Sequence, residues 1–165
     1  GPSEEQVNNT LIQRINVVTA EEMYEACHRY FSEVTIAILS AAVADYKPKN
    51  IATDKIKKKD TTLELELAPT KDILASLGAI KQHQYLVGFA LETSNEIENA
   101  LSKLERKNLD AIVLNSLKDK GAGFALDTNK VTFIDQKQDQ VHFELKSKTA
   151  VAKDIMNEIL NKLDA

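Results

Sequence analysis

The chain has 165 residues, of which 43% are hydrophobic and 28% charged, and a formal net charge of −4 at pH 7. These values are ordinary for one globular domain, so we expect a single domain over residues 1–165, and the negative charge argues against bulk attraction to nucleic acid. No apolar run approaches the roughly 20 residues that span a bilayer, and no basic segment followed by an apolar stretch opens the chain, so we expect a cytoplasmic protein without a membrane span or signal peptide.

The first elements predicted are a strand, a helix and a second strand. Ile15 to Val18 is a short apolar run typical of a strand. Thr19 and Glu22 have the spacing of a capping box, which predicts a helix from there to about Phe31. Val34 to Leu39 is almost continuously apolar and β-branched, as expected for a strand buried on both faces of a parallel sheet.

A lysine-dense loop follows that strand. Asp45 comes just after the strand's carboxyl end, which is the edge where ligands bind in open α/β sheets. The stretch AAVADYKPKNIATDKIKKK, from Ala41 to Lys59, then contains Lys47, Lys49, Lys55, Lys57, Lys58 and Lys59, with Asp54 the one carboxylate among them. Such a density repels itself unless water or a polyanion compensates it, so the loop is either a solvated surface or an anion site.

The middle of the chain predicts two more strands separated by a helix. Thr61 to Leu67 alternates leucine with polar residues, which is the period of a strand with one wet face. Thr70 is expected to cap a helix that ends near Ile80. Tyr85 to Ala90 is a third apolar strand.

The remaining elements continue the alternation of helices and strands. Thr93 and Glu96 suggest a second capping box, followed by an amphipathic helix to about Leu104. Asp110 to Leu114 is a further buried strand. The last elements are a hairpin and a helix: Lys130 to Ile134 paired with Val141 to Leu145, then an apolar stripe of Val151, Ile155, Ile159, Leu160 and Leu163.

This alternation predicts an α/β fold: a three-layer, Rossmann-like, mostly parallel twisted sheet with helices on both faces and a C-terminal β-hairpin. Other chemistries have little support. Cys27 has helical spacing with its apolar neighbours and is expected to be a small core side chain rather than a catalytic thiol. His28, His83 and His142 are too widely separated to suggest a zinc site.

Five blocks of sequence, in this order, resemble the phosphopantothenate–cysteine ligase family, the synthetase of coenzyme A biosynthesis. They are AAVADY with KIKK (41–46 and 55–58), KDIL (71–74), GFALET (88–93), KNLDAIVLN (107–115) and GAGFALDTNKV (121–131). Five ordered blocks are far more specific than one short motif. Residues 1–3 match a loop that follows an early strand in the family. The family's opening strand and helix, with a glycine-rich turn and an asparagine used in acyl activation, are therefore expected to be missing.

The resemblance implies a two-step ligation. The carboxylate of 4′-phosphopantothenate attacks the α-phosphate of cytidine triphosphate (CTP), and the amine of L-cysteine then attacks the acyl-cytidylate. Fixed cations and Mg²⁺ are the expected stabilisers of the developing phosphate charge. The resemblance also implies a homodimer, and it allows fusion to, or association with, a phosphopantothenoylcysteine decarboxylase flavoprotein.

The family's site residues transfer to matching positions here. Lys55 corresponds to the lysine that acts at the reacting centre, Asp45 to the residue that accepts from the cytosine base, and Phe89 to the aromatic that packs on the nucleotide. Lys71 replaces a proline of the family. The implied nucleotide contacts are Leu39, Ser40, Ala41, Asp45, Lys55, Thr70, Lys71, Asp72, Ile73, Phe89, Lys103 and Lys107. The sequence assigns no metal ligands.

Each of these residues also has a plainer interpretation. Asp45 suits a turn or a helix cap, Phe89 a hydrophobic core, and Lys103 with Lys107 a solvated helix face. Asn115 could simply fix a turn. Two rival functions follow: a nucleotide-binding module without catalytic activity, and an α/β structural domain without a ligand.

Overall fold

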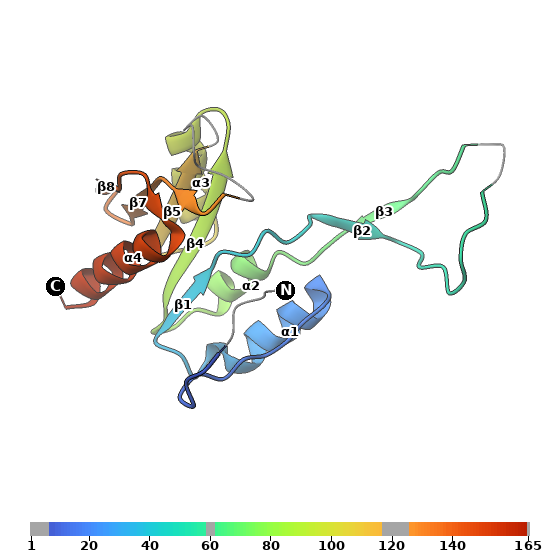
Figure 1. The fold of residues 1–165 in the computed structure, drawn as a ribbon, viewed down its shortest axis with the longest axis horizontal. Helices are drawn as coiled ribbons and strands as arrows, with labels where there is room; N and C mark the ends of the chain where they lie inside the picture. The colour runs from blue at the N-terminus through green and yellow to red at the C-terminus, as the bar shows by residue number, and fades with distance from the viewer. Residues whose placement is uncertain (1–6, 59–61, 117–125, 165) are drawn as a thin grey trace. The chain divides into compact units, whose positions relative to one another are not determined.

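The computed structural model describes residues 7–58, 62–116 and 126–164 (Figure 1). The chain forms two compact units. Unit 1 consists of Gly1–Tyr30 and Ala41–Ile73, and unit 2 of Phe31–Ser40 and Leu74–Ala165. The loop that lies between residues 40 and 74 therefore belongs mainly to unit 1, while the strands on either side of it belong to unit 2.

Unit 2 is built on a five-stranded sheet in the order β1-β4-β5-β7-β8. The strands are β1 (Ile36–Leu39), β4 (Tyr85–Glu92), β5 (Ala111–Ser116), β7 (Val131–Asp135) and β8 (Gln140–His142). The pairs β1–β4 and β4–β5 are parallel, whereas β5–β7 and β7–β8 are antiparallel. The predicted α/β fold with a C-terminal hairpin is confirmed, and it is this hairpin that makes the sheet mixed.

Helices cover both faces of this sheet. On one face, α4 (Lys148–Leu163) buries Val151, Ile155 and Ile159 against a core that includes Val87 and Phe133. Because successive strand residues point to opposite faces, the neighbour of Val87 faces the other side. There Gly88 lies under α2 (Ile73–Ile80), and an added Cβ would be 2.7 Å from Leu74 Cδ2. The third helix, α3 (Glu96–Arg106), packs against β4 and β5.

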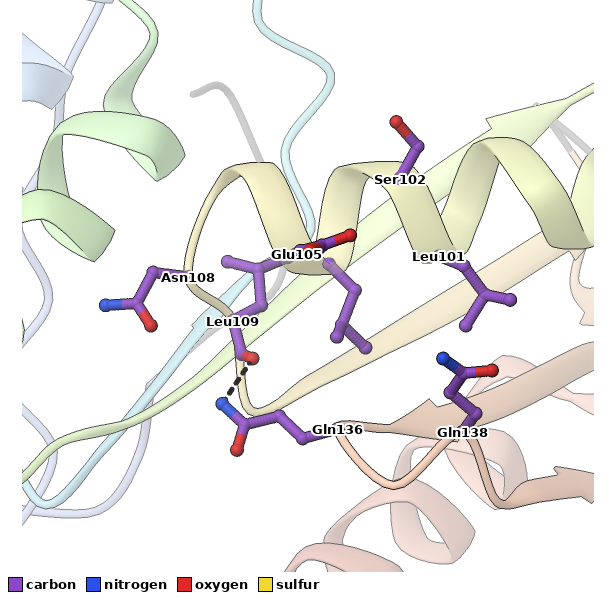
Figure 2. A pocket seen from close by; sticks show the side chains of 8 residues that line it. Leu101, Ser102, Glu105, Asn108, Leu109, Gln136 and Gln138 are labelled. Carbon is purple, nitrogen blue, oxygen red and sulfur yellow. Dashed lines mark hydrogen bonds between the residues drawn. The ribbon is translucent and has the colours of Figure 1, made fainter.

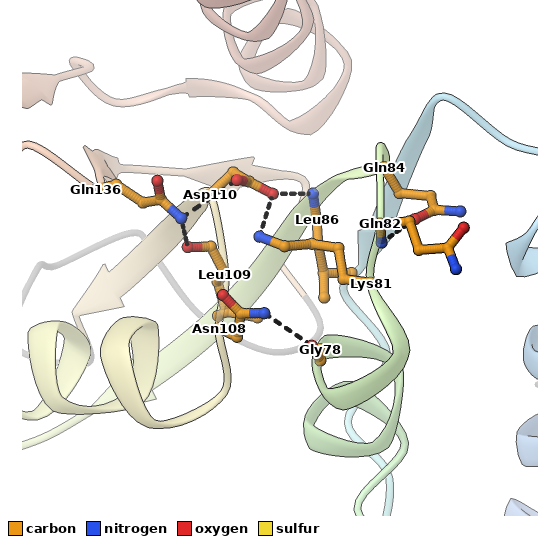
Figure 3. Close-up of polar contacts among 9 residues, drawn as sticks. All are labelled: Gly78, Lys81, Gln82, Gln84, Leu86, Asn108, Leu109, Asp110 and Gln136. Atoms are coloured by element: carbon orange, nitrogen blue, oxygen red, sulfur yellow. Dashed lines mark hydrogen bonds and ion pairs between the residues drawn. The ribbon is translucent and has the colours of Figure 1, made fainter.

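Polar contacts fix the amino ends of β4 and β5 (Figure 3). The carboxylate of Asp110 accepts hydrogen bonds from the backbone N–H of Leu86 at 2.7 Å and from Lys81 Nζ at 2.9 Å. Gln136 Nε2 donates to the carbonyl of Leu109 at 2.9 Å. Asn108 Nδ2 donates to a carbonyl of α2 at 2.8 Å. This end of the sheet is therefore held by structural hydrogen bonds, and the opposite, carboxyl end carries the candidate site.

Unit 1 contains α1 (Ala20–Phe31) apart from its last residue, and a two-stranded antiparallel ribbon. The predicted capping box of α1 is confirmed: Glu22 N–H donates to Thr19 Oγ1 at 3.1 Å, and the Glu22 carboxylate accepts from the N–H groups of Val18 and Thr19. These two backbone hydrogen bonds lower the pKa of Glu22. The ribbon pairs β2 (Tyr46–Pro48) with β3 (Leu67–Pro69), and it closes the base of the long lysine-rich loop (Figure 1).

Two predicted strands are wrong. Residues 15–18 have no strand structure, because no hydrogen-bonded partner lies beside them in the described part of the chain. Residues 62–66 are also irregular, and the leucines that were expected to face a core are exposed, Leu63 by 65% and Leu65 by 59%. The strand predicted to be buried on both faces, β1, lies at an edge of the described sheet, with Ile38 39% exposed.

Two predicted helix caps are also wrong. Helix α2 begins at Ile73, and Thr70 Oγ1 donates instead to the carbonyl of Ala44 at 2.5 Å. Helix α3 begins after Asn95, which has a left-handed conformation with φ 47° and makes no side-chain cap. The side chain of Glu96 accepts from Ser116 Oγ at 3.0 Å, so it is directed to β5 rather than back to Thr93.

Candidate functional site

A cavity of about 420 Å³ lies in unit 2, toward the carboxyl ends of the parallel strands. It is lined by residues from β4 and β5, the residue after β1, β6 and the first turns of α4: Ser40, Phe89, Asn115, Asn129, Lys148, Val151, Ala152 and Ile155. Two of the predicted nucleotide contacts, Ser40 and Phe89, therefore line this cavity. This is the edge of an α/β sheet at which ligands bind.

Asn115, one of the lining residues, has a side-chain oxygen with an unusual environment. Its Oδ1 is buried and has no hydrogen-bond partner. A buried polar atom without a partner costs about 1–3 kcal/mol, so native proteins leave few of them, and those few often serve a function. Asn115 belongs to the matched block 107–115, but its sequence position does not distinguish a site role from a turn role, because the burial of a single atom depends on the tertiary structure.

Asn129 and Lys148 are site residues that sequence reasoning missed. Asn129 belongs to β6 (Thr128–Asn129), which pairs with β9 (Lys146–Ser147) directly before α4. Its Oδ1 accepts from the N–H of Lys130 at 3.0 Å. Lys148 is the first residue of α4, which Ser147 caps by accepting from Ala150 N–H at 3.3 Å. The sequence pattern identified only the packing face of this helix.

The two lysines predicted to hold phosphates lie at the C-terminal end of α3, Lys103 inside the helix and Lys107 directly after it. Lys103 Nζ pairs with Glu92 Oε1 at 2.5 Å, and Asn99 Nδ2 donates to Glu92 Oε2 at 3.1 Å. Glu92 ends β4, and its side chain is only 14% exposed. Lys107 is the C-cap of α3, and its N–H donates to the carbonyl of Lys103 at 3.0 Å. A bound phosphate would have to compete with Glu92 for the ammonium group of Lys103.

The other predicted contacts lie in or beside unit 1. The structure brings Asp45 and Thr70 together, because Thr70 N–H donates to the Asp45 carbonyl at 2.8 Å. Lys71 forms an ion pair with Glu21 and lies 4.3 Å from the centre of the Tyr24 ring. The hydrogen bond from Lys71 lowers the pKa of Glu21 and raises that of Lys71.

The remaining predicted contacts lie in irregular segments or at the ends of helices and strands. Ala41 and Lys55 are exposed in irregular segments of unit 1, and Asp72 directly precedes Ile73, the first residue of α2. Leu39 is the half-buried last residue of β1. Three members of the sequence pattern, Lys59, Gly121 and Gly123, lie outside the described residues.

A second cavity, of about 620 Å³, lies at the other end of unit 2 (Figure 2). It is formed by the C-terminal half of α3 and the turn between β7 and β8, and its lining residues are Leu101, Ser102, Leu104, Glu105, Asn108, Leu109, Gln136 and Gln138. It contains none of the predicted contacts, and Gln136 is already occupied by the structural hydrogen bonds of the amino end. We therefore assign the candidate site to the carboxyl end.

Three further features of the described residues concern metal binding, membrane spans and the cysteine. Within residues 7–58, 62–116 and 126–164, no three His, Cys, Asp or Glu side chains are grouped to hold a metal ion. In the same ranges, no helix has both the length and the apolar composition needed to cross a membrane. Cys27 is half-buried, and burial raises the pKa of its thiol, which disfavours the reactive thiolate.

Comparison with known proteins identifies the family. Residues 1–163 match the DNA/pantothenate metabolism flavoprotein C-terminal domain. The chain belongs to this family. It is 43% identical over 149 residues to the coenzyme A biosynthesis bifunctional protein CoaBC of Bacillus subtilis, covering 90% of this chain and 37% of that protein. It is 54% identical over 150 residues to a protein named cysteine/cysteine sulfinic acid decarboxylase from an unknown prokaryotic organism, covering 90% of this chain and 42% of that protein.

A solved structure supports the same assignment. The crystal structure of the C-terminal domain of CoaBC aligns with a TM-score of 0.73 and 37% identity, covering 91% of this chain and 67% of that one. The likeness confirms the α/β fold expected from the alternating elements. The chain spans about two fifths of the length of the curated relatives described above.

Proposed function

We propose that the chain ligates 4′-phosphopantothenate to L-cysteine at the expense of CTP, as a step in coenzyme A biosynthesis. The observation that carries this proposal is the cavity at the carboxyl end of the sheet, which two of the predicted nucleotide contacts, Ser40 and Phe89, line. Family membership and the likeness to CoaBC supply the reaction class.

The proposed reaction has two balanced steps. A carboxylate oxygen of phosphopantothenate attacks the α-phosphorus of CTP, the bond to the bridging oxygen breaks, and pyrophosphate leaves. The cysteine nitrogen then attacks the acyl carbon, the bond to the phosphate oxygen breaks, cytidine monophosphate leaves, and the amine loses a proton to water. Negative charge grows on phosphate oxygens in both steps, so fixed ammonium groups lower both barriers.

The chain's own residues take the following roles. Lys55 stabilises charge at the reacting centre, and Lys103 and Lys107 hold phosphates. Asp45 accepts hydrogen bonds from the exocyclic amine of cytosine, and Phe89 packs against the nucleotide. These roles follow from the family positions that the residues match.

Magnesium is the metal that suits this chemistry, because it neutralises charge on the triphosphate. Mg²⁺ usually keeps several waters and binds through substrate phosphates with one or two carboxylates. It therefore does not require a cluster of three ligating side chains, and none is found among the described residues.

The experiment that tests the role of Lys55 is its replacement by alanine. We expect Lys55→Ala to abolish turnover while CTP binding, followed by calorimetry, is retained, because an exposed loop lysine contributes little to folding. Lys153→Ala on α4, outside the cavity lining, is the matched control. Unchanged turnover of Lys55→Ala would contradict this role.

We also propose that the chain works within a longer protein that carries a decarboxylase flavoprotein, and that it acts as a homodimer. The word bifunctional in the name of the CoaBC relatives supports the first part. Another relative is named a decarboxylase, so release of CO₂ from L-cysteine is a necessary control assay, and we expect none from this chain. The rival function, nucleotide binding without catalysis, requires CTP binding with no pyrophosphate release.

A further inference from the structure

A carboxylate at the carboxyl end of the sheet holds one of the two lysines expected to bind phosphates. Glu92 is the last residue of β4, and its side chain is 14% exposed. Its Oε1 accepts from Lys103 Nζ at 2.5 Å. Its Oε2 accepts at 3.1 Å from Asn99 Nδ2, which also donates to the carbonyl of Ser94 at 2.9 Å. Both carboxylate oxygens are therefore fixed, one by a cation and one by an amide that is itself held in place.

The positions of Glu92 and Lys103 follow from the packing of α3 on the sheet. Glu92 lies opposite Ser116 in the register of β4 and β5, at the edge where ligands bind in α/β sheets. Lys103 follows Asn99 by four residues on α3, so the two side chains share one face of the helix. Ser116 Oγ donates to Glu96 Oε1 at 3.0 Å, which connects the start of α3 to the same edge. The ion pair is thus in place before any ligand binds.

Lys103 keeps the capacity to bind a second anion. An ammonium group offers three hydrogens, and the contact with Glu92 uses one of them. The side chain of Lys103 is 36% exposed, so a dissolved phosphate can approach it. Such a phosphate competes with Glu92 for the ammonium group and is repelled by its negative charge. Any phosphate on Lys103 is therefore held more weakly than it would be without Glu92.

This competition has a use in the proposed reaction. The first step releases pyrophosphate, and a site that binds phosphates very tightly also retains this product. We propose that Glu92 is a positioning residue that exchanges with phosphate for the ammonium group of Lys103 and thereby limits the retention of pyrophosphate. The inference rests on the proposed function, in which Lys103 holds phosphates. As pyrophosphate leaves, the carboxylate takes back the ammonium group, so no unpaired cation remains beside β4.

Glu92→Gln tests the exchange. Asn99 Nδ2 stays a donor because it also binds the Ser94 carbonyl, so the new amide oxygen replaces Oε2 and the new NH₂ group faces Lys103. The ammonium group is then released. By calorimetry, CTP with Mg²⁺ and pyrophosphate should each bind about 5- to 10-fold more tightly, which lies between an exposed ion pair and a charge-assisted hydrogen bond. The KM for CTP and the inhibition constant of pyrophosphate should fall by the same factor.

Two variants show whether the effect acts through Lys103. Glu98→Gln removes the same charge from an exposed position of α3, five residues from Lys103, and should change both affinities by less than about 2-fold because salt screens exposed charges. In a Lys103→Met background, Glu92→Gln should have no larger effect than this control. If Glu92→Gln does not fold, Glu92→Met, which also removes the competing carboxylate, is measured with the same expectation.

Several results would overturn the proposal. Unchanged or weaker binding of CTP or pyrophosphate in Glu92→Gln refutes the exchange, and weaker binding is what a merely structural role predicts. Equal tightening in Glu98→Gln, or in the Lys103→Met background, shows an effect of net charge alone. Unchanged CTP binding in Lys103→Met removes the phosphate from this lysine and the inference with it. Failure of the proposed function is a separate result: no pyrophosphate release from CTP with phosphopantothenate in the wild-type chain.

Discussion

An ion pair between Lys162 and Asp135 connects the end of α4 to the β7–β8 turn, and we predict that Asp135→Asn destabilises the fold. The Asp135 side chain is only 7% exposed. Its Oδ1 accepts from the N–H groups of Lys137 and Asp139, both at 2.9 Å, and its Oδ2 from Lys162 Nζ at 2.5 Å. Asparagine keeps the acceptor for the two amides but places an NH₂ group against the ammonium of Lys162.

The cost follows from this geometry. A hydrogen bond between charged groups contributes about 1.5–3 kcal/mol, and breaking a buried pair costs about 3–5 kcal/mol. Lys162 is 27% exposed and can turn toward water, so the lower part of these ranges applies. We expect Asp135→Asn to lower the free energy of unfolding by about 2–3 kcal/mol, which for a domain of this size is roughly 4–12 °C in Tm.

The effect should depend on pH with a definite sign. Burial alone would raise the pKa of Asp135, but the hydrogen bonds from Lys162 and from the amides of Asp139 and Lys137 outweigh it and hold the pKa below its usual value. A depressed carboxylate pKa stabilises the fold above the unfolded value of about 3.9, and this stabilisation is lost as the pH falls through the folded value. The gap between wild type and Asp135→Asn should therefore be constant from pH 8 to about 5 and shrink below about 4.

Urea unfolding followed by circular dichroism, repeated at several pH values, measures this gap. Asp139→Asn is the control, because Asp139 is 67% exposed and 3.8 Å from Lys162, where an ion pair contributes at most about 1 kcal/mol. A gap below about 0.5 kcal/mol, or one that persists unchanged at pH 3, would refute the reasoning.

Three further substitutions test other parts of the structure. Gly78→Ala should lower the free energy of unfolding by about 1–3 kcal/mol in the same urea denaturation assay, because the new Cβ would lie 1.9 Å from Lys107 O. This cost outweighs the better helix propensity of alanine. The control is Ala79→Gly at an exposed position of the same helix, which reports the ordinary propensity cost of about 1 kcal/mol. Thr19→Ala should cost about 0.5–2 kcal/mol by thermal unfolding, since it removes the cap of α1. Asn115→Leu should leave the Tm unchanged or higher, because it removes a buried acceptor that has no partner. A fall in Tm would contradict that last expectation.

The sequence predicted those elements whose cause is local. The capping box of Thr19 and Glu22 forms as expected, because all its partners lie within four residues. The apolar runs of β4 and β5 are long enough to identify buried strands. Residues 15–18 have a similar composition but find no strand partner in the described chain, which a local pattern does not reveal. Glu96 fits a capping box in sequence, yet Ser116, 20 residues away, takes its side chain.

The candidate site likewise contains residues that the sequence could identify and residues that only the tertiary structure could identify. Phe89 was predicted because it belongs to a recognisable block and Ser40 because it directly precedes one, and both line the cavity. Asn115 lay in such a block too, but its significance depends on the isolation of one buried oxygen. Lys148 had no sequence signal, and Asn129 belonged to the block at 121–131 without being singled out, because both reach the cavity through the pairing of β6 with β9.

Pyrophosphate release from CTP and Mg²⁺ by this chain, measured with and without 4′-phosphopantothenate and L-cysteine, tests the central claim most directly. The proposed ligase predicts release that requires phosphopantothenate, and conversion to phosphopantothenoylcysteine with release of cytidine monophosphate once cysteine is added. CTP binding without any phosphopantothenate-dependent pyrophosphate would contradict it and leave the chain as a nucleotide-binding module.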